Sequence, residues 1–88
     1  METLTNLVAR AKEGDREAFT LIVRRLSRQA VATAHLITGD LQVGEEAAQD
    51  AFVTAWRRLR TLKDPAAFRS WFGVVLTRIA CQAGRSSA

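Results

Sequence analysis

The chain has 88 residues, of which 48% are hydrophobic, and its formal net charge at pH 7 is +4. A chain of this length forms one domain and hides only about 60–65% of its unfolded surface, so its core must be compact. Its single cysteine and single histidine exclude an intrachain disulfide and a cysteine–histidine metal cluster.

The spacing of apolar residues predicts an all-α fold, a compact bundle of about four helices. The first helix is expected from Leu4 to Glu13, with Gly14 ending it. The second is expected from about Arg16 to Thr38, capped by Asp15 and ended by Gly39. It is predicted to be central because its apolar face is broad, formed by Phe19, Ile22, Leu26, Ala30, Ala34 and Ile37 and widened by Leu21, Val23, Val31 and Leu36.

A short connection is expected over Asp40–Gly44, and a third helix then runs to about Leu59 or Leu62. A basic hinge, residues 61–65, separates it from a fourth helix, expected from Pro65 to about Ala83. Asp64 is predicted to cap this helix, and Pro65 suits its first position because a missing N–H costs nothing there. Gly84 is expected to stop the helix, so residues 85–88 should fray. The core stripe of the third helix is expected to be Ala48, Phe52, Ala55 and Leu59.

The sequence contains no catalytic constellation. Glu45, Glu46 and Asp50 lie at the predicted start of the third helix, where the helix dipole accounts for them. His35 has no nucleophile or base partner in the sequence, and Cys81 is predicted to be a small core residue. The chain is therefore expected not to be an enzyme and to need no cofactor.

Positive charge is concentrated in the second part of the chain. Residues 51–88 contain seven basic residues and one acidic residue, a net charge of +6, whereas residues 1–50 contain six basic and eight acidic residues, a net charge of −2. This asymmetry favours a polyanionic partner for the C-terminal part, with a solvated basic face as the alternative. No apolar run approaches the roughly 20 residues of a membrane span and no leader is evident, so a cytoplasmic location is expected.

Two motifs, in order and suitably spaced, resemble region 2 of the extracytoplasmic-function (ECF) sigma factors of bacterial RNA polymerase. The first comprises Glu45-Glu46, Gln49-Asp50, Phe52 and Ala55-Trp56-Arg57, which follow the pattern of an acidic pair, Gln-acid, an aromatic and Ala-Trp-Arg. The second is Phe68-Arg69-Ser70-Trp71-Phe72. A weaker likeness from Leu7 to Asp40 extends the resemblance over most of the chain, so residues 1–88 are expected to form a single region 2 domain.

The resemblance implies two binding surfaces. One faces the clamp helices of the β′ subunit of core RNA polymerase and comprises Glu46, Gln49, Asp50, Val53, Trp56 and Arg57. The other holds the single-stranded non-template strand of the promoter −10 element and comprises Arg60, Lys63, Asp64, Arg69, Ser70 and Arg78. For Trp56, a core role and a contact role are equally expected. Phe68, Trp71 and Phe72 are expected to support the core rather than to contact bases.

The fourth helix also departs from the family pattern. Residues 73–77 stand where aromatic and basic residues are usual, and Arg78 and Gln82 replace a common Asn and a common Asp. A helical interaction module without specific DNA recognition, binding for example an anti-sigma factor through Val74 and Leu76, is therefore the first alternative. A nucleic-acid-binding bundle unrelated to transcription initiation is the second. The helix-turn-helix region 4 of complete factors is not found, and the sequence leaves open whether the chain is a fragment or stands alone.

Overall fold

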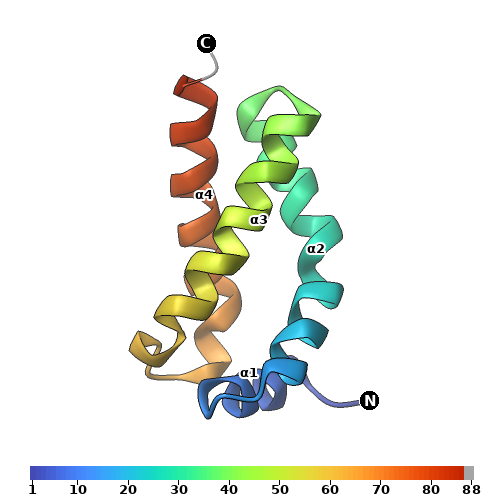
Figure 1. Ribbon diagram of the computed structural model, residues 1–88, viewed down its shortest axis with the longest axis vertical. Helices are drawn as coiled ribbons and strands as arrows, with labels where there is room; N and C mark the ends of the chain where they lie inside the picture. The colour runs from blue at the N-terminus through green and yellow to red at the C-terminus, as the bar shows by residue number, and fades with distance from the viewer. Residues whose placement is uncertain (87–88) are drawn as a thin grey trace.

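The computed structural model describes residues 1–86, and within them the chain is helical with no strand, which confirms the all-α prediction. Helices α2, α3 and α4 run side by side along the long axis of the molecule, and α1 lies across one end (Figure 1). Two 3-10 turns, η1 and η2, join α3 to α4. The elements are α1 (Leu4–Lys12), α2 (Arg16–Thr38), α3 (Leu41–Arg58), η1 (Leu59–Thr61), η2 (Pro65–Ala67) and α4 (Phe68–Ser86).

Side-chain caps fix where the helices begin, because the first N–H groups of a helix have no partner within it. Asp15 accepts a hydrogen bond from the N–H of Ala18 at 3.1 Å, and Asp40 accepts one from the N–H of Val43 at 3.1 Å. Gly39 then ends α2 with a φ of 75°, a left-handed conformation that suits glycine. The predicted bounds of α2 are confirmed, and only two residues separate α2 from α3.

The predicted connection over Asp40–Gly44 was wrong, because α3 begins at Leu41. Gly44 is a buried helical residue at a close crossing of α2 and α3. A Cβ atom at this position would lie 2.8 Å from the backbone nitrogen of His35 and 2.9 Å from its Cα atom. Glycine therefore allows the two backbones to approach here. The acidic residues Glu45 and Glu46 consequently lie in the second turn of α3, and Asp50 in the third, so the N-terminal dipole does not account for them.

The other end of the bundle also differs from the prediction. Helix α4 continues through Gly84 to Ser86, so Gly84 does not stop it. A Cβ atom at Gly84 would lie 3.4 Å from the Cα atom of Thr38, which places α4 close to the end of α2. Arg85 and Ser86 are helical rather than frayed, and residues 87–88 lie outside the described residues. Helix α1 ends at Lys12, one residue earlier than predicted.

The core combines an alanine-rich seam with an aromatic cluster. The face of α3 that packs on its neighbours contributes Ala47, Ala48, Ala51, Phe52 and Ala55. Phe52 stacks on Phe72 of α4 with ring centroids 4.6 Å apart, and Phe72 stacks on Phe68 at 5.6 Å. The predicted core stripe of α3 is therefore confirmed.

Two core predictions were wrong. Leu36 is 86% exposed, because it lies two residues from buried Ala34 and so on the other side of α2. Cys81 is exposed, because it follows buried Ala80 and is turned about 100° from the core side of α4. None of the helices in the described part of the chain has the length and apolarity of a membrane span.

Candidate interaction surfaces

One side of α3 collects the six residues predicted to contact polymerase. At about 100° per residue, positions 46, 49, 50, 53, 56 and 57 fall on the side opposite Ala48, Ala51 and Ala55. Five of the six side chains are exposed, and that of Trp56 is half-buried. We call this stripe the outer face of α3; it comprises Glu46, Gln49, Asp50, Val53, Trp56 and Arg57.

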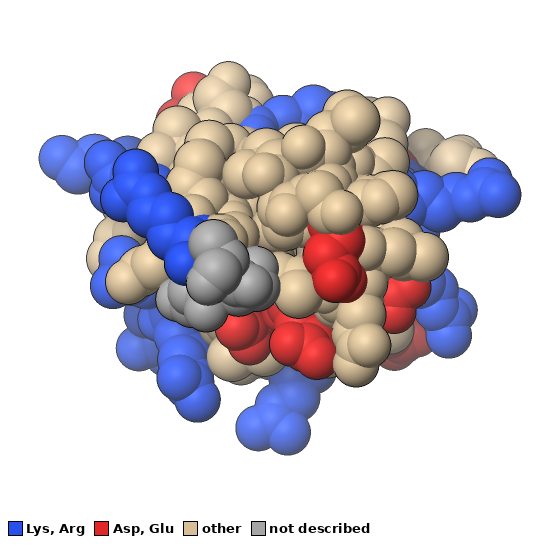
Figure 2. Space-filling model, turned by 90° about the horizontal axis from the view of Figure 1, so that it is seen from above, with Lys and Arg blue, Asp and Glu red and all other residues tan. Residues whose placement is uncertain are grey.

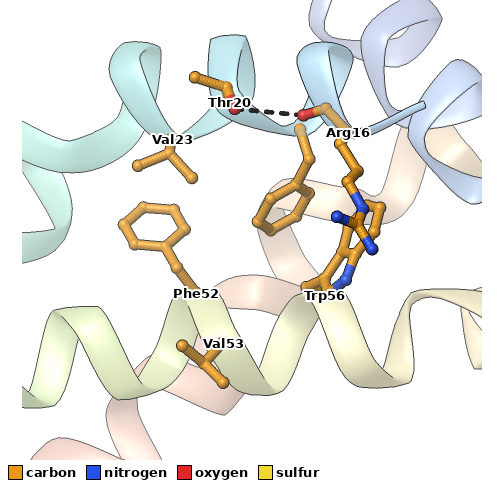
Figure 3. A pocket seen from close by; sticks show the side chains of 7 residues that line it. Arg16, Thr20, Val23, Phe52, Val53 and Trp56 are labelled. Carbon is orange, nitrogen blue, oxygen red and sulfur yellow. Dashed lines mark hydrogen bonds between the residues drawn. The ribbon is translucent and has the colours of Figure 1, made fainter. Parts of the chain in front are cut away.

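Trp56 belongs to this face and to the packing beneath it. Its ring lies 5.1 Å from that of Phe19 on α2, with a tilt of 55°. Beside this pair, a pocket of about 350 Å³ opens between α2 and α3 (Figure 3). Apolar side chains make most of its wall, and Arg16 stands at one end. Its lining residues are Arg16, Phe19, Thr20, Val23, Phe52, Val53 and Trp56.

Hollows flank the outer face of α3 on both sides. A hollow of about 530 Å³ lies between α2 and α3, beside Val31 and Gln49. Another, of about 520 Å³, lies between α3 and α4, beside Asp50, Arg57 and Gln82. The outer face is therefore a ridge whose sides a partner can also contact. Arg16 could not be assigned to this site from the sequence, because only the packing of α2 against α3 brings it beside Trp56.

Charge is unevenly spread over this ridge. Its acids, Glu46 and Asp50, lie in the second and third turns of α3, and Arg57 lies in the last turn with its neighbour Arg58. In the view onto the end of the bundle where α2 meets α3, acidic side chains gather on one side, uncharged side chains fill the centre and basic side chains project from the rim (Figure 2). A partner that follows the ridge would therefore meet negative charge first and positive charge last.

The hinge is an ordered turn. The N–H of Leu62 donates to the carbonyl of Leu59 at 3.1 Å, and the hydroxyl of Thr61 donates to the carbonyl of Arg58 at 2.7 Å. The carboxylate of Asp64 accepts from the N–H of Ala66 at 3.0 Å, so Asp64 is a cap as predicted. It caps the 3-10 turn η2, however, and α4 begins at Phe68, three residues after the predicted start at Pro65. Lys63 stands exposed between these two sets of bonds, and among the described residues it has no ion pair within 4.0 Å.

Helix α4 divides the residues predicted to contact DNA. Arg69 lines a hollow of about 210 Å³ between α2 and α4, where one of its guanidinium nitrogens (Nη1) lies 3.5 Å from the Oε1 atom of Gln29. Arg78 lines a different hollow, of about 400 Å³, between α3 and α4, together with Arg58 and Trp71. Arg60, Lys63, Asp64 and Ser70 are exposed at the hinge and the start of α4. The six residues therefore spread over the hinge and two sides of α4, and sequence reasoning missed Gln29 and Arg58.

The comparison with known families decides what this bundle is. A profile of the Sigma-70 region 2 family matches residues 22–88, which cover most of α2 and all that follows it. The chain belongs to the sigma-70 region 2 family. Helix α1 and the first residues of α2 lie outside the matched segment.

Curated sigma factors resemble this sigma-70 region 2 chain. A probable RNA polymerase sigma factor, RfaY, of Xanthomonas campestris pv. campestris is 36% identical over 70 residues, which are 80% of this chain and 18% of that protein. The RNA polymerase sigma-H factor of Pseudomonas aeruginosa is 32% identical over 65 residues, which are 74% of this chain and 34% of that protein. The matches therefore span only about a fifth and about a third of the length of these relatives. No solved structure gave a significant match.

The aromatic motif of this sigma-70 region 2 domain is mainly structural. Phe68 is fully buried, Phe72 is 5% exposed, and Trp71 is half-buried with its ring 5.8 Å from that of Phe68. The expected core role therefore agrees with the packing of Phe68 and Phe72, whereas Trp71 also lines the hollow beside Arg78. Of the two residues considered for a protein partner, Val74 is 52% exposed and Leu76 is buried, which leaves only Val74 available.

Ion pairs hold the sigma-70 region 2 bundle at the end where α1 lies. The guanidinium of Arg10 pairs with Glu2 at 2.5 Å and with Asp15 at 2.8 Å. The hydrogen bond from Arg10, helped by that from the N–H of Ala18, lowers the pKa of Asp15 below its ordinary value. Within the described residues, no group of three or more His, Cys, Asp and Glu side chains is arranged to hold a metal ion.

Proposed function

We propose that this domain works as region 2 of an ECF-type sigma factor, binding core RNA polymerase and the promoter −10 element during transcription initiation. In this proposal, the outer face of α3 contacts the β′ clamp helices, and the hinge with the start of α4 holds the non-template single strand. The role is one of binding in the cytoplasm, without catalysis, by residues 1–88 acting as one domain.

A single observation carries the polymerase part of the proposal: a polar stripe on an otherwise alanine-rich helix. Gln49 and Asp50 are exposed and have no role in the core, whereas the buried side of α3 is fully used by packing. A ridge with an apolar centre at Val53 and Trp56 and charged ends suits a helical partner, since aromatic anchors supply binding energy and charges set orientation.

The charge around the hinge supports the DNA part. Arg60, Lys63 and Arg69 are exposed, and the single acid among them, Asp64, is engaged as a helix cap. Cationic side chains on an ordered turn can hold phosphates, which supply most of the affinity for a single strand. The hollows beside Arg69 and Arg78 give two places that a base flipped out of the stack can enter.

The polymerase contact is tested by changing Gln49 and Asp50 to Ala together. We expect weaker binding to core polymerase with an unchanged fold, measured by competition for core enzyme and by circular dichroism. Glu17→Ala, an exposed acid on α2, is the control for lost charge. Wild-type binding by the double variant would contradict the assignment of this face.

The DNA contact is tested by changing Lys63 and Arg69 to Ala. We expect lower affinity for single-stranded DNA of any sequence and a salt dependence reduced by about two phosphates' worth. Arg24→Ala with Arg28→Ala removes the same charge from exposed positions of α2 and should change both quantities less. Promoter opening with core polymerase and the full-length parent protein should fall in parallel.

A second candidate function is supported by one observation. Val74 is an exposed apolar residue in the segment where the family usually carries aromatic and basic side chains. If the variant with Lys63→Ala and Arg69→Ala opens promoters as well as the parent does, the better interpretation is an interaction module that binds a protein such as an anti-sigma factor. Val74→Asp should then abolish capture of that partner.

A further inference from the structure

A contact between distant parts of the chain joins α1 to the hinge. The ammonium group of Lys12, the last residue of α1, donates a hydrogen bond to the backbone carbonyl of Leu62, 50 positions later. The Lys12 side chain is half-buried, and Leu62 is 6% exposed. Helix α1 packs against both η1 and η2, at the end of the bundle where the hinge lies (Figure 1).

The bonded carbonyl has a specific place in the hinge. It belongs to the peptide unit that joins Leu62 to Lys63, and a peptide unit is planar. A bond that fixes the Leu62 carbonyl therefore also fixes the direction of the Lys63 N–H and the starting point of its side chain. On its other side, Leu62 is held by the bond from its own N–H to the Leu59 carbonyl. Leu62 is thus held on both sides, by a bond from α1 to its carbonyl and by a bond from its N–H to η1.

Helix α1 is itself firmly attached, so Lys12 is more than a mobile surface side chain. Arg10 pairs with Glu2 and with Asp15, the cap of α2, and Arg25 of α2 donates to the carbonyl of Glu2. Leu7 and Val8 are fully buried against the rest of the bundle. Movement of the Lys12 ammonium group would therefore require movement of α1 against α2.

We propose that Lys12 is a positioning residue, which holds the hinge in the shape that presents Lys63 to the −10 strand. The proposal rests on the DNA-binding function proposed above. It also gives α1, which lies outside the segment matched by the family profile, a defined part in promoter recognition. Lys12 acts here through the backbone of Leu62 and makes no contact with DNA.

The local part of the proposal is tested by hydrogen exchange on the chain itself. Lys12→Met keeps the length and volume of the side chain but removes its donors, whereas Lys12→Arg keeps donors and charge. We expect the hydrogen-bonded hinge amides, those of Leu62 and Ala66, to exchange at least about tenfold faster in Lys12→Met, because the hinge loses a hydrogen bond from a charged donor. Lys12→Arg should restore protection. Arg24→Met, which removes one exposed charge on α2, should have no effect, and unchanged exchange in Lys12→Met would overturn the proposal.

The functional part is tested in promoter opening by holoenzyme that contains the full-length parent protein. Lys12→Met should weaken promoter opening by about tenfold in the parent, because a loosened turn no longer holds Lys63 in one place. In the Lys63→Ala background, Lys12→Met should change neither promoter opening nor its salt dependence, because Lys12 acts only through the placement of Lys63. A salt slope that Lys12→Met lowers further in that background would mean that Lys12 contacts DNA directly and would overturn the positioning role.

A loosened hinge with unchanged promoter opening would also overturn the proposal, because the bond would then serve stability alone. Failure of the proposed DNA-binding function is recognised by a different result, namely unchanged promoter opening in the variant with Lys63→Ala and Arg69→Ala. If Lys12→Met does not fold, Lys12→Gln, a neutral donor on a shorter stem, replaces it in both assays and should give intermediate values.

Discussion

The outer face of α3 and the hinge surface are supported by different packing. The outer face lies on one unbroken helix, whose buried side presses Gly44 and a row of alanines against α2. The hinge surface, residues 60–70, crosses two 3-10 turns and the start of α4. It rests on the cluster of Phe52, Phe68 and Phe72 and on hydrogen bonds from side chains.

This difference shows what each surface tolerates. Close backbone packing leaves no room for added atoms, so the support of the outer face should be sensitive to substitutions that enlarge a side chain. An aromatic cluster supplies buried area, so the support of the hinge should be sensitive to substitutions that remove atoms. Four tests can break or sharpen this comparison.

The largest effect is expected for Phe68→Ala at the hinge side. Phe68 is fully buried and contacts the rings of Trp71 and Phe72, and such truncations cost about 3–5 kcal/mol of unfolding free energy. Urea denaturation of the parent and the variant measures the loss. Trp71→Ala, at a half-buried ring, should cost clearly less, and equal losses would contradict the central place of Phe68.

The next effect separates two glycines. Gly44→Ala should destabilise the domain by about 1–3 kcal/mol, because the added methyl group meets the His35 backbone. Gly73→Ala in α4 should stabilise it by roughly 0.5–1 kcal/mol, because a Cβ there has nothing within 4 Å and alanine favours a helix. Thermal unfolding of both variants gives the signs. Destabilisation by both, or by neither, would remove the proposed contrast.

Helix caps should contribute similarly on the two sides. Asp64→Ala and Asp40→Ala each remove one bond to a helix N–H, and we expect each to lower the unfolding free energy by about 0.5–2 kcal/mol. Asp64→Asn and Asp40→Asn, which keep an acceptor, are the matched controls and should lie near the parent. An unfolding midpoint unchanged by Asp64→Ala would mean that this cap does not stabilise the hinge.

The smallest effect concerns pH. The pKa of the Asp15 carboxyl is lower in the folded state than in the unfolded chain, where an Asp carboxyl has a pKa of about 3.9. The carboxylate therefore stabilises the fold above that pH, and this contribution is lost as the pH falls through the lower pKa of the folded state. Asp15→Asn keeps a cap but loses the pair with Arg10. We expect its stability to fall less between pH 5 and pH 2 than that of the parent, as followed by thermal unfolding. Parallel pH profiles would contradict a role for the pair.

Much of the fold could be predicted from local signals, and two of the errors share one cause. Asp15 and Gly39 define α2 correctly because a cap and a left-handed glycine act within a few residues. Gly44 and Gly84 were interpreted as breaks, although each is a helical residue where two backbones approach. Sequence spacing alone cannot distinguish a glycine that turns the chain from one that makes room for a neighbour.

The same limit applies to the surfaces. The resemblance indicated six residues of α3, and a regular helix places positions 46, 49, 50, 53, 56 and 57 on one side, so their common face could be predicted from their spacing. The separation of Arg69 from Arg78 could not, because it depends on which side of α4 meets α2 and which meets α3. The contact of Lys12 with Leu62 has no local signature at all.

The two-residue link between α2 and α3 also bears on how the chain folds. Closing so short a loop costs little entropy, so the two helices can pair as a local hairpin before the hinge and α4 are in place. We therefore expect substitutions at this helical hairpin, such as Ala47→Gly, mainly to slow refolding, and substitutions at Phe68 mainly to speed unfolding. Stopped-flow kinetics in urea would test this order, in which the outer face of α3 forms early and the hinge forms last.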